Sequence, residues 1–250
     1  MADRFYCPEP IVAGLVRLTG DEAHHLARVR RLGPGDRVEL FDGLGRTYRA
    51  QVAEVGRDRV ALRIEGEPQL EPPTAVELTL ATAVPKGDRF DWLIEKATEL
   101  GVDRLIPLRT ERSVVDPRSA KLDRLRRRIV EACKQSGRSR LMALGDPIDW
   151  ADLFVSPELP EARWIAHPAA TGDPWGIEAA PGPTPMGRVI VAIGPEGGFS
   201  EGEVAQANAQ GWRRLGLGPT ILRVETAALA ACVLTQALRL AAPREGQAVH

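Results

Sequence analysis

The stretch Val189–Glu203, VIVAIGPEGGFSEGE, decides the fold that this sequence predicts. Its apolar first part is typical of a buried strand and leads into a glycine-rich turn. Ser200 and Glu203 then form the capping-box pattern that begins a helix. A buried strand followed directly by a helix is typical of a parallel sheet covered on both faces, and such sheets bind ligands at the carboxyl ends of their strands. The stretch therefore predicts an α/β domain with a binding loop after this strand.

The same alternation of strand and helix extends in both directions from this stretch. Apolar runs of strand length predict strands, and apolar residues at helical spacing predict the helices between them. The expected strands are Val76–Ala83, Leu105–Leu108, Trp164–Ala166, Val189–Ile193 and Leu215–Leu217, and the expected helices are Asp88–Leu100, Ser119–Ser136, Ser200–Gly211 and Thr226–Leu240.

The first seventy residues have a different pattern. Val38–Phe41, Thr47–Val55 and Arg59–Ile64 alternate apolar and polar positions, which predicts strands of a small barrel, and Thr19–Leu32 predicts one short helix among them. The stretch Glu65–Pro73, EGEPQLEPP, holds three prolines and few large apolar residues, so we expect the domain boundary there.

Composition excludes several classes of protein. The chain has 250 residues, 44% of them hydrophobic, and 33 basic against 34 acidic side chains give a net charge of −1. It is therefore neither intrinsically disordered nor basic overall, and any nucleic acid must bind a local patch. The N-terminus lacks a signal-peptide core and no apolar run is long enough to span a membrane, which predicts a cytoplasmic protein.

Cysteines and histidines do not form the patterns of a metal site or a disulfide framework. Cys7, Cys133 and Cys232 are odd in number and far apart, and we expect no bound metal. The four histidines are too scattered for a metal triad; they are His24, His25, His167 and His250.

A second glycine-bearing segment, Leu215–Ala228 (LGLGPTILRVETAA), also leads from a strand to a helix. Its polar triplet Arg223, Glu225 and Thr226 would present donors and acceptors over a cleft. The alternative is that Glu225 or Thr226 simply caps the last helix, although a cation such as Arg223 is unfavourable there. The chain has no P-loop, no dinucleotide-binding glycine motif and no nucleophile elbow, so the ordinary nucleotide and hydrolase sites are excluded.

Basic residues gather in two places. Arg28, Arg30, Arg31 and Arg37 form a cluster in the first domain. Between positions 121 and 140 eight basic residues face two acidic ones; the basic ones are Lys121, Arg124, Arg126, Arg127, Arg128, Lys134, Arg138 and Arg140. Each cluster is either a phosphate-binding patch or a solvated face, and two patches in two domains favour an RNA partner.

Six segments taken together resemble one known family. They are RFYCPEP, HHLARVRRLGPGDRVELFDG, KGDRFDWLIEKATELGV, EACKQSGR, IGPEGGFS and LGPTILRVETA. Their order is similar to that in the RsmE family, the bacterial 16S ribosomal RNA (uridine-N3) methyltransferases of the SPOUT superfamily. The resemblance covers the chain from Arg4 to about Leu240. One segment departs from the family: Lys134–Arg138 is KQSGR where the family has acid-Gln-Cys-Gly-Arg, which leaves Gln135 and Arg138 as candidate RNA or dimer contacts.

The resemblance implies the architecture. It implies an RNA-binding, PUA-like β-barrel over residues 1–70 and a SPOUT α/β domain with a deep trefoil knot over residues 74–245. It also implies S-adenosyl-L-methionine as cofactor and a homodimer whose two subunits complete the site. The loop Thr171–Gly187, rich in proline and glycine, is assigned no role.

Site residues are carried over from the family's motifs. Three loops would bind the methyl donor; their residues are His167, Pro168, Ile193, Gly194, Pro195, Glu196, Gly197, Leu217, Gly218, Leu222, Arg223 and Thr226. Arg223 would stabilise negative charge on the uracil, and Glu196 or Glu225 would act as base or orienter. Glu196 could equally be a turn carboxylate that bonds its own backbone. The candidate RNA contacts are Arg4, Arg28, Arg30, Arg31, Lys86 and Arg138.

Three hypotheses for function remain open from the sequence. The first is methylation of N3 of one specific uridine in 16S ribosomal RNA, with the assembled small subunit as substrate and partner. The second keeps the knotted methyltransferase but changes the substrate to tRNA or a ribose hydroxyl. The third is a non-catalytic RNA-binding assembly factor, which the intact glycines of both loops disfavour.

Overall fold

The chain divides into two units in its computed structural model, which describes residues 3–12, 14–74, 76–116, 122–156, 159–168 and 187–241. The first unit comprises Met1–Pro73 and Val130–Leu141, and the second comprises Thr74–Ile129 and Met142–His250. The predicted start of the helix at Ser119, and all of the loop Thr171–Gly187 except its last residue, lie outside the described residues.

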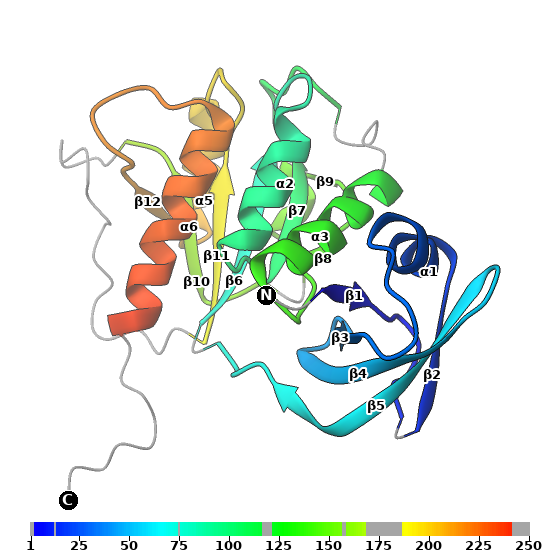
Figure 1. Cartoon of the computed structure of the whole chain (residues 1–250). Helices are drawn as coiled ribbons and strands as arrows, with labels where there is room; N and C mark the ends of the chain where they lie inside the picture. The colour runs from blue at the N-terminus through cyan, green and yellow to red at the C-terminus, as the bar shows by residue number, and fades with distance from the viewer. Residues whose placement is uncertain are drawn as a thin grey trace, which may run out of the picture. The chain divides into compact units, whose positions relative to one another are not determined.

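A parallel sheet forms the centre of the second unit (Figure 1). Its strand order is β12-β10-β11-β6-β7-β8, with β9 beside β7, and every pair is parallel. The strands are β6 (Glu77–Ala83), β7 (Arg104–Arg109), β8 (Ala143–Leu144), β9 (Ile148–Asp149), β10 (Ala162–Ala166), β11 (Arg188–Ile193) and β12 (Arg213–Leu215). The predicted parallel α/β sheet is therefore confirmed.

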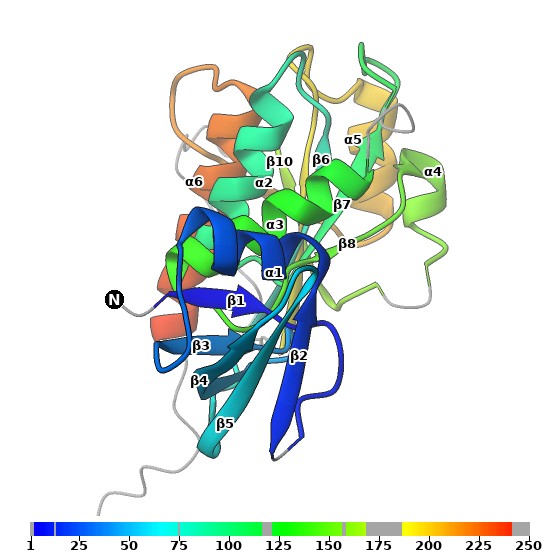
Figure 2. The same cartoon turned by 45° about the vertical axis from the view of Figure 1, so that its right-hand side comes forward.

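Helices cover both faces of this sheet (Figure 2). They are α2 (Arg89–Glu99), α3 (Leu122–Ser136), α4 (Trp150–Leu153), α5 (Glu201–Ala209) and α6 (Val224–Ala241). Helix α6 packs against β6, β11 and α2. Ile190 of β11 belongs instead to an apolar cluster with Trp150, Val204 of α5 and Trp212. Successive side chains of a strand point to opposite faces, and both faces of β11 are covered by helices. Its residues after Arg188, Val189–Ile193, are therefore all apolar and buried.

The start of α5 confirms the predicted capping box. The Ser200 hydroxyl accepts a hydrogen bond from the Glu203 backbone N–H at 3.3 Å, and the Glu203 carboxylate accepts one from the Ser200 N–H at 2.8 Å. The second oxygen of Glu203 accepts from the Glu111 N–H at 2.8 Å, so this carboxylate also binds the loop after β7. These hydrogen bonds fix the C-terminal end of the glycine-rich turn, where the turn meets α5.

The last helix and the strand before it begin earlier than predicted. Strand β12 ends at Leu215, which leaves Leu217 in the loop, and α6 begins at Val224. Glu225 and Thr226 therefore lie in the first turn of α6, and Arg223 is the residue immediately before it. The interpretation of Glu225 or Thr226 as a residue that precedes and caps the helix is wrong.

The first unit holds a five-stranded curled sheet in the order β1-β3-β4-β5-β2 (Figure 1). The strands are β1 (Arg4–Tyr6), β2 (Leu15–Thr19), β3 (Arg37–Phe41), β4 (Arg46–Val55) and β5 (Arg59–Leu70). The sheet encloses an apolar core that includes Phe5, Leu26, Leu40 and Leu62. Its end strands β1 and β2 do not pair with each other in the described part of the chain, so the sheet is a half-barrel rather than the closed barrel we expected.

Two local features of the first unit differ from the sequence prediction. Strand β5 continues to Leu70 through the predicted linker, because Pro68 lies at an irregularity of the β4–β5 ladder where no N–H donor is needed. The predicted helix Thr19–Leu32 is a short α-helix, α1 (Gly20–His24), followed by a π-helical turn, η1 (His25–Val29).

The end of α3 belongs to the first unit rather than to the second. Glu71 accepts hydrogen bonds from the backbone N–H groups of Ser139 and Arg140, at 2.6 and 2.8 Å. Arg4 donates to the Ser139 hydroxyl at 2.9 Å and to the Cys133 carbonyl at 3.3 Å. The predicted RNA contact Arg4 is only 7% exposed, so its guanidinium is used to bind this segment to the sheet and that prediction is corrected.

No helix in the described part of the chain is long and apolar enough to cross a membrane. The three cysteines are buried and carry free thiols. Burial raises the pKa of the Cys7 thiol, which keeps it protonated and unreactive at neutral pH.

Replacement of Ser200 by Ala tests the capping box. We expect the free energy of unfolding to fall by about 1 kcal/mol, because the Glu203 N–H loses its acceptor at the start of α5. Urea unfolding followed by circular dichroism measures this loss, and Ser136→Ala, an exposed serine at the other end of a helix, is the matched control. Equal losses for the two variants would contradict the assigned role.

Candidate functional site

Three loops that are distant in sequence meet at one edge of the parallel sheet. Strands β10, β11 and β12 are neighbours, with β10 in the middle, so the loops after their carboxyl ends are adjacent. The His167 N–H donates to the Leu215 carbonyl at 3.2 Å and holds the first loop against the third. The loops enclose a cavity of about 260 Å³. Its lining residues are Ala166, His167, Pro168, Ile193, Gly194, Pro195, Glu196, Gly198, Leu215, Leu217, Gly218, Pro219, Thr220, Ile221, Leu222, Val224 and Ala227.

Glycine is favoured at two positions of these loops. A Cβ atom on Gly194 would lie 3.0 Å from the ring of Phe199 and 3.3 Å from the backbone of Gly198, so these neighbours would have to shift by a few tenths of an ångström. Gly218 has φ of 109°, a backbone conformation that other residues rarely adopt. The Gly198 N–H donates to the Pro195 carbonyl at 2.8 Å and closes the turn, which leaves Glu196 exposed near its tip.

Nine of the twelve residues predicted to bind the methyl donor line this cavity. The three others, Gly197, Arg223 and Thr226, are each adjacent in sequence to a lining residue. The cavity wall is therefore made of apolar side chains, glycines and prolines, with His167 and Glu196 as its ionisable groups.

A second cavity of about 410 Å³ shares Glu196 with the first. Its other lining residues are Lys86, Arg89, Val114 and Arg223. Arg223 is exposed, and its side chain makes no hydrogen bond or ion pair with any residue that the structure describes. An unpaired guanidinium in such a cavity is available to stabilise negative charge on a bound group. Glu196 lies between an apolar cavity and a cationic one.

Arg89 connects the two predicted carboxylates. Its guanidinium lies 3.2 Å from Glu196 and 3.5 Å from Glu225, and its Nε donates to the Lys86 carbonyl at 3.1 Å. Glu225 is only 7% exposed, and its Oε2 atom has no hydrogen-bond partner among the described residues. A buried carboxylate of this kind needs its cation, so Arg89 holds together the turn after β6, the turn after β11 and the start of α6.

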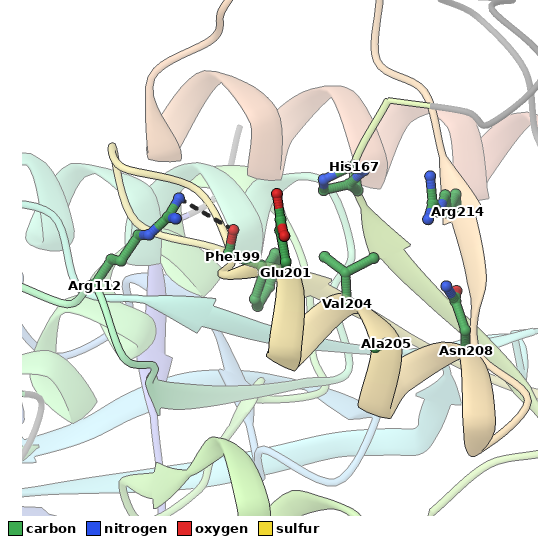
Figure 3. Close-up of a pocket in the computed structure, with 8 residues that line it drawn as sticks. All are labelled: Arg112, His167, Phe199, Glu201, Val204, Ala205, Asn208 and Arg214. Carbon is green, nitrogen blue, oxygen red and sulfur yellow. Dashed lines mark hydrogen bonds between the residues drawn. The ribbon is translucent and has the colours of Figure 1, made fainter.

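Arg112 holds the glycine-rich turn from its other side. Its Nη1 atom donates to the carbonyl of Gly197 at 2.9 Å and to that of Phe199 at 3.3 Å (Figure 3). A cavity of about 370 Å³ lies beside it, and His167 lines both this cavity and the apolar one. Figure 3 shows His167 at the end of β10 above α5, with Arg112 on the far side of the cavity.

Arg89 and Arg112 were not predicted from the sequence. Both follow the carboxyl end of a parallel strand, Arg89 after β6 and Arg112 after β7. Because parallel sheets bind ligands at the carboxyl ends of their strands, these two loops were candidates on the same grounds as the other three. Lys86 was chosen from the same turn as Arg89, but nothing in the sequence shows which of two neighbouring cations faces a carboxylate.

Three of the eight basic residues predicted as a patch between positions 121 and 140 pair with acids from other elements, and a fourth, Arg126, pairs within α3. Arg124 binds Asp91 at 2.7 Å, Arg128 lies 3.6 Å from Glu95, and Arg126 binds Asp123 at 2.9 Å. Lys134 binds Glu22 at 3.0 Å and is 8% exposed. The free positive charge of residues 121–140 is therefore smaller than the sequence of this segment alone indicates. Lys121 lies outside the described residues.

The other predicted RNA contacts fall into two groups. Arg28, Arg31 and Lys86 are exposed, whereas Arg30 forms an ion pair with Asp3. Arg138 is half-buried and has further contacts within the chain. No group of three histidine, cysteine or acidic side chains able to hold a metal ion occurs among the residues placed by the structure. His250 lies outside them.

Family models match both parts of the chain. A model described as an RNA methyltransferase domain matches residues 72–236, and one described as an RNA methyltransferase PUA domain matches residues 18–65. The first of these models covers most of the chain.

Two curated relatives are similar over most of their length. The ribosomal RNA small subunit methyltransferase E of Synechocystis is 34% identical over 92% of this chain and 76% of its own length. The protein of the same name from Bacillus subtilis is 31% identical over 85% of this chain and 86% of its own length.

A solved structure agrees with these relatives. The ribosomal RNA small subunit methyltransferase E of Neisseria gonorrhoeae, determined with S-adenosyl methionine, is 30% identical and superposes with a TM-score of 0.84 over 95% of this chain and 98% of that one. Together with the family models, these similarities show that the chain belongs to the ribosomal RNA small subunit methyltransferase E family, the RsmE family.

Proposed function

We propose that this chain transfers the methyl group of S-adenosyl-L-methionine to N3 of one specific uridine in the 16S ribosomal RNA of the small ribosomal subunit. Family membership makes it an RNA methyltransferase that uses this donor. The observation that carries the finer proposal is the pair of cavities, one apolar and one cationic, that share Glu196. One suits the donor and the other suits a nucleotide.

The residues of the apolar cavity fit an adenosyl group. Ile193, Leu217 and Leu222 provide apolar walls for a flat ring, and the glycine and proline turns bring backbone polar groups to its edge. His167 and Glu196 line the same cavity and can meet the charged end of the molecule. When bound, S-adenosylmethionine supplies an electrophilic methyl group on a sulfonium.

The chain's own residues must then prepare the uracil nitrogen. N3 of uracil carries a weakly acidic proton, and its removal spreads negative charge to the two flanking carbonyl oxygens. Glu196, exposed between the two cavities, accepts this proton in our proposal. Arg223, whose side chain has no counterion among the described residues, stabilises the charge that develops on the carbonyl oxygens. The target uridine must leave its stack to enter the cavity.

Glu225 takes a positioning role rather than that of a base. Its carboxylate is buried and bound to Arg89, so it does not reach a nucleotide in the cationic cavity. Through Arg89 it fixes the side chain of Glu196. The two candidate carboxylates thus differ in burial, and burial assigns them different roles; the sequence alone could not distinguish them.

The rest of the architecture follows from the same family. We infer that residues 1–70 act as the RNA-binding PUA-like domain and residues 74–245 as the SPOUT domain, with a trefoil knot in the loops that line the apolar cavity. We also infer a homodimer that works in the cytoplasm, where its partner, the small ribosomal subunit, is found.

Nucleoside analysis separates this proposal from its alternatives. Mass spectrometry of ribosomal RNA and tRNA from cells with and without the gene should show loss of 3-methyluridine from 16S ribosomal RNA alone. Loss of a tRNA or ribose methylation instead would favour a different substrate, and unchanged nucleosides would favour a non-catalytic assembly factor.

Replacement of Arg223 by Ala tests its electrostatic role. We expect kcat to fall by about 10²- to 10³-fold, as for the loss of one oxyanion donor, while calorimetry shows donor binding within about threefold of wild type. Lys96→Ala removes a half-buried cation of α2 that pairs with Glu95 and Glu99 and is the control. Turnover near wild type in the Arg223 variant would remove this residue from the mechanism.

A double-mutant cycle tests the link between Arg89 and Glu225. Arg89→Ala should lower the free energy of unfolding by about 1–3 kcal/mol, because the buried carboxylate loses its cation. Adding Glu225→Gln should recover part of this loss, since the amide needs no counterion. Urea unfolding gives the coupling energy, and strictly additive effects would show that the pair does not interact.

The same variants report on the positioning of Glu196. Arg89→Ala should lower kcat about ten- to hundredfold through misplacement of the Glu196 carboxylate, and Arg89→Lys should restore part of it. Wild-type kcat in Arg89→Ala would contradict the positioning role even if stability fell.

A further inference from the structure

We propose that the exposed side of β2 and β5 in the first unit, with the cavity at its end, is a docking site for the phosphodiester backbone of RNA. This inference rests on the proposed RNA substrate and says where, outside the catalytic cavities, that substrate is held. We call the site the arginine face; it consists of Arg17, Arg28, Arg57, Arg59 and Arg63.

Strand register brings three of these arginines together. Arg17 of β2 lies opposite Ala61 of β5, so Arg59 and Arg63 are its diagonal neighbours on the same side of the sheet. Diagonal neighbours have their Cα atoms about 7–8 Å apart, within reach of long side chains. The three side chains are exposed. Like charges at such positions repel and destabilise the sheet, so their placement costs stability unless an anion binds between them.

A cavity of about 150 Å³ continues this surface. Arg28, Arg57 and Arg59 line it together with His24 and Asp58. Arg59 therefore belongs both to the sheet surface and to the cavity. The cavity also has two glycines, Gly20 and Gly56, on its wall, which let a bound group approach the backbone closely.

The five arginines have no internal partner among the residues that the structure describes. None of them has an ion pair or side-chain hydrogen bond there, whereas Arg30, Arg37 and Arg46 of the same unit each pair with a carboxylate. The nearest acids are Asp58 in the cavity, Glu54, which lies opposite Ala61 on β4, and Glu65, which follows Arg63 by two residues on β5 and pairs with Arg37. The face therefore keeps an excess of uncompensated positive charge, which attracts a polyanion.

An uncommon backbone conformation presents Arg28 to this cavity. Arg28 lies in the π-helical turn η1, and Arg31 follows with φ of 57°, the one non-glycine residue in the described ranges with positive φ. π-Helical turns are rare and occur often at functional sites, and a left-handed backbone conformation is strained for arginine. Local strain next to unpaired cations supports a binding role for this element rather than a purely structural one.

The composition of the face identifies the kind of contact. The positions that alternate outward on β2 and β5 are Leu15, Arg17, Thr19, Arg59, Ala61 and Arg63, without an aromatic residue on which a base could stack. Guanidinium groups bind phosphate oxygens with paired hydrogen bonds. The face therefore suits the RNA backbone, read without sequence preference, and leaves base recognition to the catalytic cavities.

The test compares two charge-matched double variants of the full chain. R17Q/R59Q removes two unpaired arginines, and R37Q/R46Q removes two that pair with Glu65 and Asp42. Binding of purified small ribosomal subunits and of polyuridylate is measured by filter binding at several KCl concentrations. For R17Q/R59Q we expect about tenfold weaker binding and a slope of log K against log [KCl] that is smaller by about 1.4–1.8, since each lost phosphate contact contributes about 0.7–0.9. R37Q/R46Q should change binding less than twofold.

Three further readouts make the result decisive. R17Q/R59Q should raise KM for the subunit while kcat and donor binding remain at wild-type values, and its melting temperature should not fall, because like charges are removed. R17K/R59K keeps the charges and should keep the salt slope. The docking site would be overturned if both double variants lost the same affinity for the subunit, or if the salt slope of R17Q/R59Q did not change. Continued formation of 3-methyluridine would show that the proposed function still holds. Failure of the wild type to methylate uridine N3 would instead overturn the proposed function and leave the RNA-binding result standing.

Discussion

The parallel alignment of β10, β11 and β12 is the constraint on which the site depends. In a parallel sheet all strands end at the same edge, so loops far apart in the sequence become neighbours there. The strand order places β10 between β11 and β12, and the His167 N–H bound to the Leu215 carbonyl holds two of the loops together. Without this alignment the glycine turns would be ordinary connections. With it they enclose one apolar cavity.

Electrostatics then divides this edge of the sheet into two environments. The apolar cavity is built from glycines, prolines and aliphatic side chains, and the cavity beside it carries Lys86, Arg89 and Arg223. Glu196 belongs to both, and Arg89 ties it to the buried Glu225. In our proposal Glu196 accepts the N3 proton at the boundary between the donor cavity and the cationic cavity, where Arg223 can stabilise the charge left on the uracil. The position of Glu196 therefore follows from the ends of three strands and one ion-pair network rather than from its own turn alone.

Sequence reasoning could predict the features that depend on local pattern. The apolar run of β11, the capping box of Ser200 and Glu203, and the alternation of strands and helices are all encoded within a few residues, and the structure confirms them. The features it missed depend on residues distant in sequence. Pro68 is accommodated in β5 because it lies at an irregularity of the β4–β5 ladder, and Arg4 is buried because the segment after α3 returns to the first sheet. No local window contains that information.

The same distinction explains which cations remain free. On α3 the sequence shows eight basic residues against two acids, yet Asp91, Glu95 and Glu22, which lie elsewhere in the chain, pair with Arg124, Arg128 and Lys134. The acids nearest to the arginine face, Glu54, Asp58 and Glu65, pair with none of its five arginines among the described residues. The members of that face are spread from position 17 to position 63 and form no run in the sequence. A dense basic segment can therefore lose much of its charge to acids from elsewhere in the fold, while scattered arginines brought together by strand register keep theirs. For a protein with a net charge of −1 this matters, because attraction to RNA then depends on where positive charge is left unpaired and not on how much of it the chain contains.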